Sequence, residues 1–149
     1  LVRRICPNSG REAPIAGCIQ MLIDEQFKDL PDQYRSRITD AKSVLHLAPT
    51  PECPNGTRGR MAVMETLEIT PELEKLILVN APEADMYKVA RKNGFISMRE
   101  DAIMKALRHE IPFEEVGDLG GGFLEAGDDA DPDATPVDNS APLPEREAV

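Results

Sequence analysis

Two four-residue runs, Cys6-Pro7-Asn8-Ser9 and Cys53-Pro54-Asn55-Gly56, each have the form of a Cys-x-x-Cys metal knuckle that lacks its second cysteine. A structural zinc site needs four thiolate or imidazole ligands in a tetrahedron, and two such knuckles are a common source of them. Ser9 and Gly56 stand where the second sulfurs would be, and neither residue can replace a thiolate as a strong zinc ligand. We therefore expect the architecture of a metal lobe to survive here without the metal.

The metal-site candidates are Cys6 and Cys53, and we expect them to be unoccupied. A wider set that suits zinc has three sulfurs and one imidazole nitrogen, from Cys6, Cys18, Cys53 and His46. In chain order these four residues are 12, 28 and 7 positions apart. No two of them therefore form a Cys-x-x-Cys turn, which would hold a pair of ligands in position. Cys18 falls beside the apolar stripe of a predicted helix, where we expect a small buried hydrophobe. Packing alone should hold the lobe together.

The sequence gives less support for a catalytic site than for a degenerate metal site. A cysteine nucleophile needs a histidine to deprotonate it and a third group to orient that histidine. His46 lies in a strand-like segment and His109 at the end of an amphipathic helix, so both are expected to be structural or solvent-exposed. The sequence contains no Gly-x-x-x-x-Gly-Lys-Ser/Thr phosphate-binding loop. By its own residues this chain should not hydrolyse ATP, and no catalytic residue or cofactor is assigned to it.

Composition favours a helical body with a separate acidic tail. Hydrophobic residues make up 41% of the 149 residues, but aromatics only 4%, so the core should be aliphatic and should suit packed helices. The net charge is −10, of which −8 falls on residues 117–149. A nucleic-acid binder should show a basic patch with stacking aromatics, and direct membrane binding needs a basic amphipathic face. We expect neither here.

The cysteine count and hydropathy predict a cytoplasmic location. Three cysteines are an odd number, from which we expect no disulfide framework. Nothing in the sequence resembles a signal peptide or an apolar run long enough to span a membrane.

Three zones follow one another along the chain. Residues 1–58 are irregular and proline-punctuated and form the degenerate metal lobe, whereas residues 59–116 read as a strand followed by a helical subdomain. Residues 117–149 lack periodicity and cannot bury enough apolar surface, which predicts a disordered tail. The predicted fold class is α+β, mostly α. The predicted elements are helices over 14–29 and 32–38, strands over 44–47 and 60–69, and three short helices before residue 111.

Local signals place the ends of these three helices. Thr70 caps the first, with Pro71 at its first position, and Asn93-Gly94 ends the second in a left-handed conformation. Ser97 and Glu100 form a capping box at the start of the third. The residues expected to face inward are Leu73, Leu76, Ile77 and Asn80 on the first helix and Ile103, Ala106 and Leu107 on the third.

Four segments also occur in a characteristic order. They are Leu1-Val2-Arg3-Arg4-Ile5-Cys6-Pro7, Asn55-Gly56-Thr57-Arg58-Gly59-Arg60, Gly94-Phe95-Ile96-Ser97-Met98-Arg99-Glu100-Asp101-Ala102-Ile103 and Phe113-Glu114-Glu115-Val116. In this order they resemble the C-terminal region of type II secretion and type IV pilus assembly ATPases, over residues 1–116. The second knuckle is about four residues shorter than the family pattern, so that its second cysteine and a Gly-Tyr pair are missing.

The resemblance implies a part of a hexameric cytoplasmic ATPase that works at the inner membrane. In that family the phosphate-binding loop, the catalytic glutamate and the acidic and histidine boxes all precede the metal lobe. The chain reads as the end of a longer protein, so ATP and Mg²⁺ would belong to the parent and zinc is not expected. The implied partners are a homo-hexamer through the upstream core and inner-membrane secretion or pilus assembly proteins, without direct membrane insertion.

Arg3, Arg4 and Arg11 are the interface candidates. In the family their segment adjoins the nucleotide-binding core and a neighbouring subunit, where the planar arginine fork suits carboxylates or phosphates. The alternative is a set of solvated charges. Arg60 and Glu65 match the family's Gly-Arg and strand glutamate and, if buried, should pair with each other or with helix ends.

The function expected from these features is architectural: a lobe and helical unit that support hexamer assembly and couple ATP hydrolysis, performed elsewhere, to pilus or pseudopilus assembly. The alternative is a stand-alone, non-enzymatic helical interaction module derived from the same family. Residues upstream of Leu1 would discriminate between them.

Overall fold

The computed structural model describes residues 1–119, and these form an α+β fold that is mostly helical, as predicted. The predicted tail lies outside the described residues, apart from its first three. The elements in chain order are β1 (Val2–Ile5), β2 (Arg11–Pro14), α1 (Cys18–Phe27), α2 (Asp32–Arg35), β3 (Ser43–His46), β4 (Thr57–Met61), α3 (Pro71–Leu78), α4 (Glu83–Lys92), α5 (Met98–Leu107) and α6 (Glu114–Gly117).

Two small antiparallel sheets join distant parts of the chain. β1 pairs with β4, with Arg3 opposite Arg60, and β2 pairs with β3, with Arg11 opposite His46. The sequence did not predict β1 or β2, because each is only four residues long and forms on a partner more than 25 residues away. The strand predicted over residues 60–69 was largely wrong, because β4 spans Thr57–Met61 and overlaps it only at residues 60 and 61. Residues 62–70 continue outside any described strand.

The helix-end signals are confirmed. Thr70 caps α3 by accepting a hydrogen bond from the Leu73 backbone N–H at 3.3 Å, and the capping box of Ser97 and Glu100 opens α5. Gly94 follows α4 with φ of 81°, the left-handed conformation that favours glycine. These signals work because each satisfies backbone groups that the helix itself leaves unpaired.

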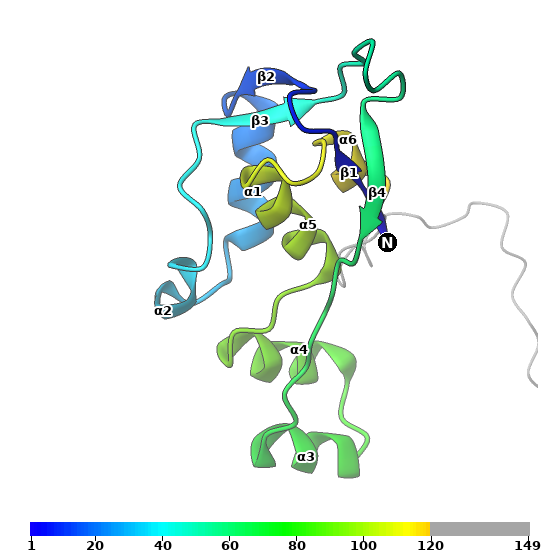
Figure 1. The fold of residues 1–149 in the computed structure, drawn as a ribbon. Helices are drawn as coiled ribbons and strands as arrows, with labels where there is room; N and C mark the ends of the chain where they lie inside the picture. The colour runs from blue at the N-terminus through cyan, green and yellow to red at the C-terminus, as the bar shows by residue number, and fades with distance from the viewer. Residues whose placement is uncertain (120–149) are drawn as a thin grey trace, which may run out of the picture.

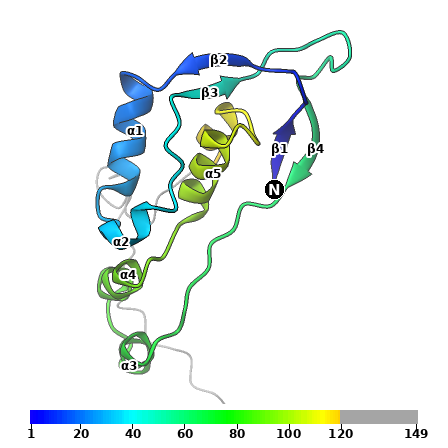
Figure 2. The same cartoon turned by 60° about the vertical axis from the view of Figure 1, so that its left-hand side comes forward.

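The hydrophobic core is centred on α5. Ala102, Ile103 and Ala106 have no exposed surface, and Leu107 is also buried, which confirms the predicted inward face. In both views α5 lies between α1 and the β1–β4 pair, with β2 and β3 across one end (Figures 1 and 2). The same cluster includes residues from both predicted zones, among them Val2, Ile23, Phe27, Leu30, Val44 and Val63. Residues 1–58 and 59–116 therefore share one core.

α3 is the exception, because its predicted apolar stripe is largely uncovered. Of the four predicted residues, Leu73 is buried and Leu76 is partly buried, but Ile77 is 46% exposed and Asn80 is also exposed. α3 packs on α4 at the end of the molecule farthest from β2 and β3 (Figure 1). The prediction of a buried stripe was wrong for most of its length, because α3 packs mainly on α4 and that contact covers only part of its apolar face.

Candidate functional site

The two half-knuckles meet, as a metal lobe would require, but their cysteines are bonded to each other. Cys6, which follows β1, and Cys53 in the β3–β4 loop form a disulfide, with Cα atoms 6.6 Å apart and a separation of 47 positions in sequence. The expectation of no disulfide framework was therefore wrong. An odd cysteine count excludes only complete pairing, and the fold brings together two of the three.

Backbone hydrogen bonds hold both turns in place. The Ser9 N–H donates to the Cys6 carbonyl at 3.1 Å and the Gly56 N–H donates to the Cys53 carbonyl at 2.9 Å, so each run closes on itself as a turn. The Cys6 N–H donates to the Gly56 carbonyl at 3.1 Å and links the two turns. The buried Ser9 hydroxyl donates to the Ala48 carbonyl at 2.6 Å. Ser9 thus works as a hydrogen-bond donor within the lobe.

The residues around these turns do not fit a zinc site. Cys18 is exposed at the start of α1, so the prediction of a buried hydrophobe there was wrong: its position faces outside the apolar stripe that Ile23 and Phe27 bury. His46 Nδ1 lies 2.9 Å from Glu114 Oε1. Within residues 1–119, no three or more His, Cys, Asp or Glu side chains are grouped so that they could hold a metal ion. The wider ligand set is not assembled.

The three interface candidates lie on two different strands. Arg3 pairs with Glu115 of α6: its Nε donates to Oε1 at 2.6 Å and its backbone N–H to Oε2 at 2.8 Å. Glu115 is buried, whereas the Arg3 side chain is 50% exposed, so Arg3 neutralises an internal carboxylate and still reaches solvent. Arg4 and Arg11 are exposed, on β1 and β2. Their role at an interface remains a prediction.

Arg60 and Glu65, which match the family pattern, are both exposed. Arg60 lies opposite Arg3 in the β1–β4 ladder. Glu65 Oε2 accepts a hydrogen bond from the Met98 backbone N–H at 3.2 Å, and Met98 is the first residue of α5. Glu65 therefore accepts a hydrogen bond from a free N–H at the start of α5, as expected for a helix end. It does so from an exposed position, whereas the expectation assumed a buried one.

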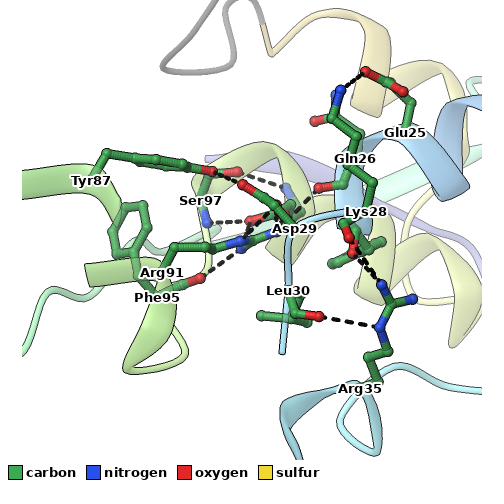
Figure 3. Close-up of polar contacts among 12 residues, drawn as sticks. Glu25, Gln26, Lys28, Asp29, Leu30, Arg35, Tyr87, Arg91, Phe95 and Ser97 are labelled. Atoms are coloured by element: carbon green, nitrogen blue, oxygen red, sulfur yellow. Dashed lines mark hydrogen bonds and ion pairs between the residues drawn. The ribbon is translucent and has the colours of Figure 1, made fainter. Parts of the chain in front are cut away.

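A buried ion pair that sequence reasoning missed connects α4 to the core. Arg91 of α4 donates to both carboxylate oxygens of Glu100 on α5, at 2.9 and 2.5 Å, and both side chains are 4% exposed. Arg91 also donates to Asp29, at 2.8 Å, and to the Phe95 carbonyl, at 2.7 Å (Figure 3). The capping box revealed Glu100, but no local pattern marks a pair nine residues apart on separate helices.

Burial and charge at this junction shift two pKa values. Burial lowers the pKa of Arg91, but hydrogen bonds and charge from Glu100 and Asp29 outweigh it, so the net shift is upward. Burial also raises the pKa of Tyr87 to about 12, although Arg91 opposes this shift. Tyr87 donates to Asp29 at 3.1 Å. Arg91 therefore stays charged and Tyr87 stays neutral across the physiological range, and their contacts position α4.

The two histidines, which were expected to be structural or solvent-exposed, each contact a different element of the fold. His109 Nε2 lies 2.9 Å from the Ser43 carbonyl and ties the end of α5 to β3. Glu114 accepts from the Leu47 backbone N–H at 3.2 Å and contacts His46. Burial raises the pKa of Glu114, but hydrogen bonds from its own backbone N–H, His46 and Leu47 outweigh it and hold the pKa below its ordinary value.

Comparisons with known proteins agree with the order of motifs. The family model described as type II/IV secretion system protein matches residues 1–118. The type II secretion system protein E of Xanthomonas campestris pv. campestris is 37% identical over 67 residues, 45% of this chain and 12% of that protein. The type IV pilus assembly ATPase PilB of Pseudomonas aeruginosa is 33% identical over 64 residues, 43% of this chain and 11% of that protein.

A third relative, PilB of Thermus thermophilus, is 33% identical over 61 residues, 41% of this chain and 7% of that protein. The chain therefore spans 12% or less of the length of these curated relatives. In the described part of the chain, no helix combines the length and the hydropathy needed to cross a membrane.

Proposed function

Because the chain belongs to the type II/IV secretion system protein family, we propose that it forms the C-terminal part of a type II secretion or type IV pilus assembly ATPase. The observation that carries this proposal is the family match over residues 1–118, almost the whole of the described structure. Relatives with this match are named as a pilus assembly ATPase or as a secretion system protein. The sequence has no phosphate-binding loop, so ATP and Mg²⁺ would be bound by other parts of the parent.

In this proposal the chain supports assembly of a homo-hexamer and couples ATP hydrolysis to pilus or pseudopilus assembly. Arg4 and Arg11 supply exposed guanidinium groups that could meet carboxylates of an upstream core or a neighbouring subunit. Ile77, Leu78 and Val79 give α3 an apolar surface that suits contact with inner-membrane assembly proteins. The location that follows is cytoplasmic and peripheral to the inner membrane through partners.

A chimera tests this proposal. The region of Pseudomonas aeruginosa PilB that aligns with this chain is replaced by residues 1–118, and the product is examined by light scattering for mass and by phosphate release for ATPase activity. We expect a hexamer that hydrolyses ATP, whereas PilB with that region deleted should lose assembly. The 149-residue chain by itself should release phosphate at background rate, since it lacks the loop that holds a triphosphate.

Matched variants make the chimera test specific for the arginines. Arg4→Ala combined with Arg11→Ala should lower the fraction of hexamer, and Lys42→Ala combined with Arg58→Ala removes the same charge from two other exposed positions as a control. A chimera that folds but stays monomeric and inactive would contradict the proposal. That result would favour the stand-alone interaction module, for which the exposed apolar surface of α3 is the supporting observation.

A further inference from the structure

We propose that Cys6 and Cys53 form a redox-dependent cross-link that takes the place of a metal ion in this lobe. Two turns from distant parts of the chain meet as the halves of a zinc site do, yet only one sulfur comes from each turn. Two thiolates are too few for a structural zinc site, which uses four protein ligands. They are, however, the number needed for one disulfide.

The other two knuckle positions are already committed to hydrogen bonds. The Ser9 hydroxyl donates to the Ala48 carbonyl at 2.6 Å, and the Gly56 carbonyl accepts from the Cys6 N–H at 3.1 Å. Ser9 is also buried, so its hydroxyl would lose this bond if it turned toward a metal. Gly56 has no side chain to offer. The lobe is therefore built around the cysteine pair and the backbone bonds beside it.

The cross-link would stabilise the lobe by closing a long loop. It ties the end of β1 to the loop before β4, and the enclosed segment contains β2, α1, α2 and β3. Joining residues 47 positions apart removes many conformations from the unfolded chain. A metal ion held by two knuckles would join the same two points. The disulfide thus reproduces the mechanical effect of the metal through different chemistry.

The link can open without unfolding the lobe. The β1–β4 ladder and the bond from the Cys6 N–H to the Gly56 carbonyl hold the two turns together independently of the sulfurs. Reduction would therefore leave the thiols close to each other and ready to pair again. Cys6 is 4% exposed, and Cys53 is only partly buried, so Cys53 is the sulfur that a small reagent would reach first.

The step needs a low-molecular-weight disulfide as oxidant, such as glutathione disulfide. The Cys53 thiolate attacks one sulfur of the reagent, forming a mixed disulfide and releasing one thiolate. The Cys6 thiol then loses its proton and attacks the Cys53 sulfur, releasing the second. The protein thiols give up two electrons and two protons in total, and the reagent becomes two thiols. Excess glutathione reverses both steps.

Thiol counting and thermal unfolding of the 149-residue chain test the proposal. After equilibration with glutathione disulfide, we expect one free thiol in place of three, and a non-reducing peptide map with Cys6 joined to Cys53. The oxidised form should unfold about 10 °C above the reduced form, from the closure of the long loop. Cys18→Ser should show the same shift, since Cys18 is exposed and outside the pair.

Single variants separate the cross-link from other redox effects. Cys6→Ser and Cys53→Ser should each have the same melting temperature with oxidant and with reductant. A disulfide that involves Cys18, three persistent thiols, or equal melting temperatures for the two forms of the unmodified chain would overturn the proposal. So would one equivalent of zinc, measured by elemental analysis after purification under reducing conditions. None of these readouts depends on ATPase activity or hexamer assembly.

Discussion

The α5-centred body and the α3–α4 pair of helices are held by different kinds of contact. In the body, α5 is covered by α1, by strand β3 and by α6, and several of its side chains have no exposed surface. α3 packs mainly on α4, and Ile77, Leu78 and the following Val79 are exposed at its end. The difference shows that helical spacing of apolar residues predicts a helix, but it does not predict whether anything covers that helix.

The junction between these two parts is polar, which is unusual for so buried a position. Arg91 of α4 reaches Glu100 and Asp29, and Gly94 brings the chain against the Tyr34 ring. Charges and one close backbone approach therefore set the position of α4 on the body. Because such contacts are directional, they fix orientation more strictly than an aliphatic surface would.

The largest expected effect is at this junction. Arg91→Met should lower the free energy of unfolding by about 3–5 kcal/mol, because Glu100 would remain buried without its cation. Lys88→Met is the matched control on the same helix: its ion pair with Asp85 is exposed, so the change should be within about 0.5 kcal/mol. Urea denaturation measures both.

A second substitution sharpens this result. Adding Glu100→Leu to Arg91→Met should recover part of the lost stability, because the buried carboxylate is then removed as well. If the double variant is no more stable than Arg91→Met, the ion pair is not what holds α4 to the body.

The next effect compares apolar side chains of the two regions. Ile103→Ala on α5 should cost about 2–5 kcal/mol, because it opens a cavity in a fully buried core. Ile77→Ala on α3 should change stability by no more than about 0.5 kcal/mol, because that side chain is 46% exposed. Denaturation curves give the values, and hydrogen exchange should be faster in α3 than in α5. A large loss from Ile77→Ala would contradict the contrast between the regions.

A smaller effect is expected at the glycine beside Tyr34. Gly94→Ala should cost about 2–4 kcal/mol, because a Cβ there would lie 2.6 Å from the Tyr34 ring and the residue has φ of 81°. Gly59→Ala shares the left-handed conformation, with φ of 77°, but its Cβ would have no neighbour within 4 Å. Only the conformational cost of about 1–2 kcal/mol should remain there. Equal losses in thermal unfolding would exclude a role for the Tyr34 contact.

The smallest effect is at the surface of the body. The pKa of Glu114 is lower in the folded chain than in the unfolded one, so its contribution is present above about pH 4.5 and is lost as the pH falls through the folded pKa. Glu114→Gln should therefore lower the free energy of unfolding by less than about 1 kcal/mol at pH 7. In acid, the variant and the unmodified chain should have nearly the same stability.

Exposed Glu52→Gln removes the same charge elsewhere and serves as the control for Glu114→Gln. Denaturation curves recorded between pH 3 and 7 should show a pH-dependent difference only for Glu114→Gln. A difference that persists unchanged in acid would mean that shape, and not charge, explains the contribution of Glu114.

Local sequence signals predicted much of the fold, and they failed where distant contacts decide. The capping box at Ser97, the cap at Thr70 and the left-handed end at Gly94 were readable because each depends on residues within a few positions. Strands β1 and β2 were missed, since their pairing is set by partners elsewhere in the chain. The two cysteine turns were recognisable, but their bond to each other was not.

The sequence by itself determined the family, the helix ends at Thr70, Gly94 and Ser97 and the absence of a phosphate-binding loop, because these depend on the order and local spacing of residues. Tertiary structure decided that Cys6 meets Cys53, that Arg3 pairs with Glu115 and that Arg91 is buried against Glu100. Each of these pairs joins residues from different elements. Their contact is fixed only when the aliphatic core around α5 forms and brings those elements together.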